Sequence, residues 1–216
     1  SVLIGYETGA AITTGVKNVA VGSFALDAAN TGQENTAIGH QALTADTKGQ
    51  RNVAVGAGAL ATQNFTSATN SYNIGVGYNA GNLITTGQSN TLIGALAGDG
   101  FDTESNNLAI GQAALGGAVA GGEYNVAIGN NTLDALTSAD YVTAVGYDAG
   151  TANTTGYSNV FIGADAGKAN TEGFNNTFVG RGAGQANTTA DSNTFIGDVA
   201  GGAVTTGGNN IMIGHL

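Results

Sequence analysis

The chain has 216 residues, a formal net charge of −10 and 37 glycines, and it contains no proline, cysteine or tryptophan. The absence of cysteine excludes disulfide bonds and thiolate metal sites. The negative charge excludes the basic surface of a nucleic-acid-binding protein, and no apolar run approaches the roughly 18 residues of a membrane-spanning helix. We therefore expect no nucleic-acid partner and no membrane insertion of this segment.

From the N-terminus onward, a glycine preceded by isoleucine or valine recurs at an almost constant interval. Ten of the twelve intervals are 17 residues, one is 21 and one is 18. A fixed period of this length is typical of a protein that stacks one supersecondary unit many times. We call these residues the anchor glycines: Gly5, Gly22, Gly39, Gly56, Gly77, Gly94, Gly111, Gly129, Gly146, Gly163, Gly180, Gly197 and Gly214.

Each repeat reads N-x-x-[IV]-G, then a small residue three places after the glycine, then a polar stretch that often ends in T-T-G. The first part alternates with a period of two, which predicts a short strand, and the threonines and glycine of the second part predict a turn. Val19 and Val21, with their equivalents, share one face, which we expect to be the inside of the coil. The sequence therefore predicts an all-β fold over residues 1–216, a β-solenoid of twelve coils that forms a single repetitive segment of a longer fibre chain.

An asparagine stands four residues before most of the anchor glycines. Stacked copies of one amide can bond to each other from coil to coil, so we expect a structural ladder rather than a row of ligand-binding amides. The predicted ladder consists of Asn18, Asn35, Asn52, Asn73, Asn90, Asn107, Asn125, Asn159, Asn176, Asn193 and Asn210.

The residue at the centre of each predicted strand is never polar, although it points away from the valine pair. An exposed apolar stripe marks an interface, so we expect this row to join the chains of a parallel homotrimer. The alternative is a wider coil that folds back and buries the row internally. The predicted interface residues are Leu92, Phe161, Phe178, Phe195 and Met212.

The coil from Asn52 to Tyr72 is four residues longer than the others. We expect a loop with Phe65 to project from the solenoid here. Insertions in repeat proteins often lie on the binding face, so Asn64 and Phe65 are a candidate binding loop, with a neutral insertion as the alternative. Aromatic residues also precede several ladder asparagines, where they could stack on sugars or, as we favour, plug the turn. They are Tyr72, Tyr124, Tyr141, Tyr157 and Phe174.

The repeat N-[TSV]-[VA]-[IV]-G-x-x-A resembles the head repeats of trimeric autotransporter adhesins of the YadA type, and similar units occur in bacteriophage tail-fibre-like and bacterial surface-fibre proteins. The resemblance covers all twelve coils. It implies a left-handed parallel β-roll, a trimer, and a role in a shaft and in surface adhesion. The repeat of that family is shorter than the 17 residues found here, so details of its binding surface do not transfer.

Catalysis needs converging titratable groups, and this chain has few of them. His40 and His215 follow anchor glycines at a variable position, and only Asp99, Asp102 and Glu104 cluster, in a coil that has lost its T-T-G. We therefore expect no enzyme, no metal site and no cofactor.

The sequence predicts a structural and adhesive segment of an extracellular fibre, on a cell or virion surface. Its expected partners are further copies of itself, with a host-surface or glycan receptor as a candidate. The alternatives are a subunit that stacks end to end into a filament, and a ligand- or ice-binding solenoid that uses its threonine rows.

Overall fold

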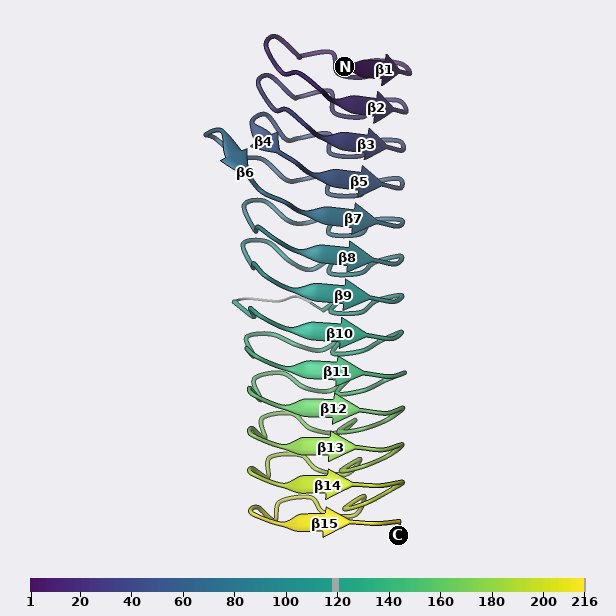
Figure 1. The fold of residues 1–216 in the computed structure, drawn as a ribbon, viewed down its shortest axis with the longest axis vertical. Helices are drawn as coiled ribbons and strands as arrows, with labels where there is room; N and C mark the ends of the chain where they lie inside the picture. The colour runs from purple at the N-terminus through teal and green to yellow at the C-terminus, as the bar shows by residue number, and fades with distance from the viewer. Residues whose placement is uncertain (118–120, 216) are drawn as a thin grey trace. The chain divides into compact units, whose positions relative to one another are not determined.

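The computed structural model describes residues 1–117 and 121–215, which contain fifteen short strands and no helix. The chain divides into two compact units, Ser1–Asn107 and Leu108–Leu216, and each is described by itself. Figure 1 shows that within each unit the strands of the main sheet lie side by side and point the same way.

The first unit contains one parallel sheet and one small strand pair. Its sheet has the order β1-β2-β3-β5-β7-β8, and each of its strands has three residues. The bounds are β1 Val2–Ile4, β2 Val19–Val21, β3 Thr36–Ile38, β5 Val53–Val55, β7 Ile74–Val76 and β8 Thr91–Ile93. The separate pair is β4 Gly49–Gln50 with β6 Thr69–Asn70, also parallel.

The second unit contains a parallel sheet of the order β9-β10-β11-β12-β13-β14-β15. Its strands are β9 Leu108–Ile110, β10 Val126–Ile128, β11 Thr143–Val145, β12 Val160–Ile162, β13 Thr177–Val179, β14 Thr194–Ile196 and β15 Ile211–Ile213. Equivalent residues of successive coils pair directly, as Phe161 does with Phe178. The prediction of an all-β parallel β-solenoid with about twelve coils of about 17 residues is therefore confirmed.

The predicted inside and outside of the strands are reversed. The central residue of a strand points into the coil: Ala20, Leu92 and Phe161 have no exposed surface. The two flanking residues point outward, and Ile38 and Ile162 are each 39% exposed. A period of two fixes which residues share a face but not which face is buried.

The predicted trimer interface therefore lies inside the chain's own coils. The side chains of Leu92, Phe161, Phe178 and Phe195 are fully buried, and Phe178 stacks between its two neighbours at ring-centroid distances of 5.6 and 5.0 Å. Met212, on β15, is 37% exposed. The prediction that this row is an exposed stripe between subunits is wrong, because the chain folds back over it and buries it internally.

The coil interior is filled by two positions whose sizes are complementary. In five of the six coils whose strand centre is alanine, the residue six places later is leucine: Ala20/Leu26, Ala37/Leu43, Ala54/Leu60, Ala109/Leu115 and Ala127/Leu133. Two coils have no large residue at either position: Ala144/Gly150 and Gly75/Gly81. Where the strand centre is large, the later residue is glycine, as in Leu92/Gly98, Phe161/Gly167, Phe178/Gly184 and Phe195/Gly201. Because interiors are close-packed, each coil has room for only one large side chain at these two positions.

The predicted ladder asparagines bond mainly to backbone groups rather than to each other. The backbone N–H of Asn176 donates to Oδ1 of Asn159 at 2.9 Å, and Nδ2 of Asn176 donates to the carbonyl of Ala190 at 2.8 Å. The same arrangement recurs in the first unit, where Asn35 donates its N–H to Oδ1 of Asn18. Each side chain thus joins its own coil to the next one, and most of these side chains are buried.

Candidate functional site

The outer face of the sheet forms a uniform surface in each unit, and we call it the outward face. It consists of the first and third residue of every strand, all half-buried or exposed. In the first unit these are Val2, Ile4, Val19, Val21, Thr36, Ile38, Val53, Val55, Ile74, Val76, Thr91 and Ile93. In the second unit they are Leu108, Ile110, Val126, Ile128, Thr143, Val145, Val160, Ile162, Thr177, Val179, Thr194, Ile196, Ile211 and Ile213.

The outward face is apolar and uncharged, apart from its threonine hydroxyls. Parallel strands lie about 4.8 Å apart and successive outward residues on one strand about 6.6 Å apart, so each unit presents a regular two-dimensional array of small apolar groups. Monomeric soluble proteins rarely expose a large contiguous apolar patch. Contiguous apolar surface of this kind therefore indicates a binding face.

The inserted coil does not present its phenylalanine. Phe65 is 5% exposed, so the prediction that it projects from the solenoid is wrong. The cause is the buried carboxylate of Asp46, which accepts hydrogen bonds from the backbone N–H groups of Gly49 at 2.8 Å and Phe65 at 3.4 Å and holds the chain inward. Asn64 is exposed, and its Oδ1 accepts a hydrogen bond from the hydroxyl of Thr47.

Asp46 is part of a buried polar group. Nε2 of Gln63 donates to its carboxylate at 2.6 Å, while Oε1 of Gln63 accepts from Nδ2 of the ladder residue Asn73 at 2.8 Å. Burial raises the pKa of Asp46 above its ordinary value, although these hydrogen bonds partly oppose the shift. The group anchors the extra loop, and Figure 1 shows β4 and β6 set apart from the main strands beside it.

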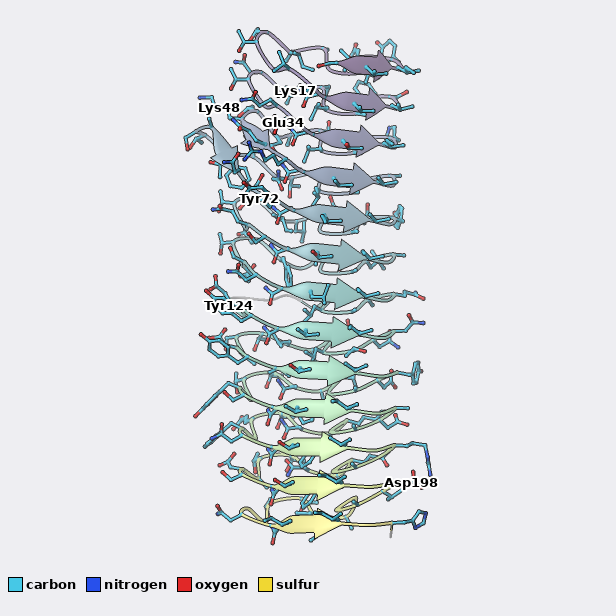
Figure 2. The ribbon with its side chains drawn as sticks, in the orientation of Figure 1. Lys17, Glu34, Lys48, Tyr72, Tyr124 and Asp198 are labelled. Atoms are coloured by element: carbon cyan, nitrogen blue, oxygen red, sulfur yellow. The ribbon has the colours of Figure 1, made fainter. Side chains whose placement is uncertain are left out.

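A second row of side chains lies along the edge where the strands begin. In the first unit it is ionic: Nζ of Lys17 lies 3.0 Å from Glu34, and Nε of Arg51 lies 2.8 Å from the same carboxylate. Arg51 lowers the pKa of Glu34, with a further contribution from Lys17. Arg51 also donates to the hydroxyl of Tyr72 at 2.9 Å. Figure 2 shows Lys17, Glu34 and Tyr72 at this edge of the first unit.

In the second unit the same edge is aromatic, with side chains from the two positions that precede the ladder position. Tyr124 and Tyr141 stack with their ring centroids 5.3 Å apart, and Tyr157 and Phe174 stack at 4.9 Å. Tyr124, Tyr141 and Tyr157 are 49%, 60% and 45% exposed. The prediction that these aromatics plug the turn is wrong, because their side chains point outward from the coil.

The opposite edge of each unit carries scattered polar contacts. Tyr6, Phe24 and His40 make edge-to-face ring contacts in the first unit. In the second unit Lys168 bridges Asp148 and Asp165, and Asp198 accepts from Arg181 at 2.9 Å. Figure 2 places Asp198 at this edge, across the sheet from Tyr124.

The threonine rows are used for the fold. In the second unit the hydroxyls of Thr137, Thr154 and Thr171 each donate to the carbonyl of the equivalent threonine one coil later, at 3.0 to 3.2 Å. The hydroxyl of Thr188 donates to Thr205 in the same way. These hydroxyl hydrogens are therefore not available to ice or to another ligand.

Across residues 1–117 and 121–215 there is no group of three histidine or acidic side chains placed to hold a metal ion. The same residues include no helix that is long and apolar enough to span a membrane. The candidate binding surfaces are therefore the apolar outward faces, the ionic edge of the first unit and the aromatic edge of the second.

Comparisons with protein-family models, curated proteins and solved structures find no match to this chain.

Proposed function

We propose that this chain is a structural and adhesive segment of an extracellular fibre, in which copies associate in parallel through their outward faces as a homotrimer. The observation that carries the proposal is the outward face, which is apolar, regular and without a charged residue in either unit. Burying such a surface against further copies removes it from water, which stabilises the assembly by about 25 cal/mol for each Å² of apolar surface buried.

The shape of the outward face also favours copies of the same chain as its partner. A repeating array is matched best by another array with the same spacing, and an in-register association sets the same coils against each other along the whole face. The resemblance of the repeat to YadA-type head repeats supports the trimer, a left-handed coil and a place on a cell or virion surface. The external partner of the fibre is then a host-surface or glycan receptor.

The experiment is to measure the mass of the purified chain by light scattering after size exclusion. We expect three times the 21.1 kDa of one chain. The variant Ile38→Lys/Ile162→Lys places a charge on the outward face of each unit, where both residues are already 39% exposed. It should give a folded monomer by circular dichroism, whereas Thr155→Lys/Thr189→Lys, at exposed turns of the second unit, should leave the mass unchanged.

A monomeric wild-type chain at concentrations of about 100 μM, which would imply an association too weak to be specific, would contradict the proposal. A mass that keeps growing as the protein concentration rises would favour the end-to-end filament over the trimer.

Ice binding is a second candidate, favoured by one observation. The outward face holds Thr36 and Thr91 in the first unit, and Thr143, Thr177 and Thr194 in the second, among its valines and isoleucines. This location differs from that of the threonine rows described above, whose hydroxyls donate to backbone carbonyls. Thermal hysteresis that disappears in Ile38→Lys/Ile162→Lys, in a wild-type chain that is monomeric, would assign the face to ice instead of to self-association.

A further inference from the structure

At the edge where the strands begin, one row of side chains comes from a fixed position in every coil, immediately before the ladder asparagine or, for Tyr141, before Val142. We call it the turn row. Its residues all have φ between +51° and +64°. They are Lys17, Glu34, Arg51, Tyr72, Ser89 and Asn106 in the first unit, and Tyr124, Tyr141, Ser158, Asn175, Ser192 and Asn209 in the second.

Both units contain the same succession in three consecutive coils of the turn row: a tyrosine, then a serine, then an asparagine. The first succession is Tyr72, Ser89 and Asn106, and the second is Tyr141, Ser158 and Asn175. A left-handed φ suits asparagine, but it is unusual for a bulky side chain such as tyrosine. The same left-handed φ occurs at this position in every coil, so it belongs to the turn of the repeat and brings each of these side chains to the same edge.

The ring of Tyr72 is covered on only one face. The guanidinium of Arg51, from the preceding coil, lies over the ring at 5.8 Å from its centroid. Because Arg51 belongs to the preceding coil, we infer that the opposite ring face lies on the side of the following coil, in which the backbone N–H of Ser89 donates to the carbonyl of Ser71 at 2.8 Å. The side chain of serine is too short to cover a phenol ring, and Tyr72 is 48% exposed.

Tyr141 has the same arrangement in the second unit. Tyr124, from the preceding coil, stacks on one face with an angle of 5° between the ring planes. The following coil presents Ser158, whose backbone N–H donates to the carbonyl of Asp140 at 3.0 Å. Tyr157, at the neighbouring position of that coil, stacks on Phe174 instead. In both units the succession therefore gives an open ring face beside a hydroxyl, with an amide one coil further.

We call this succession of tyrosine, serine and asparagine a step, and its shape suits a sugar ring. The electron-rich face of an aromatic ring attracts the weakly positive C–H hydrogens on one face of a pyranose. The coils are about 4.8 Å apart, so a sugar stacked on the tyrosine lies above the serine and within reach of the asparagine, which supply hydrogen bonds to its hydroxyls. Arg51 is paired with Glu34, and the carboxylate of Asp140 adjoins Tyr141 in sequence. These charges favour a neutral sugar over an acidic one.

We propose that the Tyr72–Ser89–Asn106 and Tyr141–Ser158–Asn175 steps are two binding sites for neutral pyranose units of a glycan. The inference deepens the adhesive part of the proposed function and rests on it, because it names the chemical class of the receptor. Each site is open rather than enclosed, so a single sugar binds weakly. Two sites on each chain, and several chains in an assembly, raise the avidity for a surface that displays many glycans.

The experiment measures capture of the full chain on arrays of immobilised maltohexaose, cellohexaose and chitohexaose, with hyaluronan oligosaccharides as the acidic counterpart. We expect capture on at least one neutral probe. Tyr72→Ala/Tyr141→Ala should reduce it by roughly tenfold or more, which corresponds to the loss of one good aromatic contact at each site. The control Tyr78→Ala/Tyr147→Ala removes exposed tyrosines outside the turn row and should leave capture unchanged.

A second variant keeps both tyrosines and closes their open faces. Ser89→Tyr/Ser158→Tyr would place a ring where each sugar is expected, in the way that Tyr124 covers Tyr141, and it should abolish capture while circular dichroism remains unchanged. No capture on any neutral probe, capture on hyaluronan alone, or capture that survives both turn-row variants would overturn the inference.

Light scattering on the same samples separates this inference from the proposed assembly. A monomeric wild type whose capture is lost in the turn-row variants refutes the trimer and supports the sugar sites. A trimer with no capture on the neutral probes refutes the sugar sites alone.

Discussion

The ring of Phe178 occupies the space that a side chain at Gly184 would need. A Cβ added to Gly184 would lie 2.5 Å from Cδ2 and from Cε2 of that ring, closer than real Cβ contacts. In five of the six coils with alanine at the strand centre, leucine stands at the equivalent of Gly184 and is fully buried, as Leu26 and Leu43 are. The two positions thus share one volume inside the coil.

The shared volume predicts that Phe178 and Gly184 can be exchanged only together. Phe178→Ala leaves a cavity and should cost about 3–5 kcal/mol, while Gly184→Leu alone collides with the ring. The double variant Phe178→Ala/Gly184→Leu recreates the Ala–Leu arrangement of other coils, so it should be more stable than either single variant. Urea unfolding followed by circular dichroism measures the coupling free energy as a double-mutant cycle.

A mismatched pair serves as the control for this exchange. Phe161→Ala/Gly201→Leu alters the same residue types in coils that do not share the volume, because Gly201 faces Phe195. It should show no recovery. If the unfolding free-energy changes of Phe178→Ala and Gly184→Leu simply add in the double variant, the two positions do not stabilise the fold through a shared volume.

The period of the sequence was sufficient to predict the coil but not its inside. The anchor glycines fix the strand positions, and a strand in a parallel stack can pair only with its equivalents, so fold class and register follow from spacing alone. The face does not follow, because alternation is symmetric between the two sides of a strand. The β-branched pair resembled a core only because it is larger than the alanine between its members.

A signal for the buried face was nevertheless present in the sequence. Phe161, Phe178 and Phe195 are each followed six residues later by glycine, whereas Ala20 and Ala37 are followed by leucine. Compensation of volume is expected only between side chains that share an interior. The position of Phe65 could not be predicted in this way, because it depends on a single buried carboxylate, Asp46, that has no equivalent in the other coils.

The ladder asparagines should tolerate no replacement that removes either their donor or their acceptor. Asn176→Ala leaves the carbonyl of Ala190 and the N–H of Asn193 without their present partners in a buried location. Each unsatisfied group costs about 1–3 kcal/mol, so the variant should lose several kcal/mol in urea unfolding. Gln185→Ala, at an exposed position of the same coil, is the control and should change little. A loss no larger than that of the control would mean that water replaces the ladder at little cost.

The anchor glycines should be irreplaceable because their φ is positive and because the adjacent coil leaves no room for a Cβ. A single substitution to alanine tests both. Gly163 has φ +131°, and a Cβ there would lie 2.5 Å from the carbonyl oxygen of Gly180. The backbone strain alone costs about 1–3 kcal/mol, and the collision adds to it, so Gly163→Ala should lower the unfolding midpoint strongly. Gly207→Ala meets no atom closer than 3.5 Å and should be close to neutral. Equal midpoints for the two variants would show that adjacent coils can separate to admit a methyl group.

Asp46 should make stability depend on pH in the direction opposite to an ordinary paired carboxylate. Because burial raises its pKa in the folded chain, the protonated form is favoured by folding. Its contribution to stability is therefore greatest below its ordinary pKa and is lost as pH rises through the raised value. Asp46→Asn removes the titration and keeps an acceptor for the N–H of Gly49, so its advantage over wild type should be larger at about pH 7 than at about pH 3.

The reverse substitution provides the matched test of this pH dependence. Asn170 occupies the equivalent position of a coil in the second unit, where it is buried and its Nδ2 donates to the carbonyl of Gly173 at 2.9 Å. Asn170→Asp replaces that donor by a buried carboxylate, so it should destabilise the chain at neutral pH and lose part of the penalty on acidification. The test is to measure the urea unfolding midpoints of the wild type and both variants between about pH 3 and about pH 7. If the difference between wild type and Asp46→Asn is constant, or grows as the pH falls, the buried carboxylate does not titrate as its surroundings require.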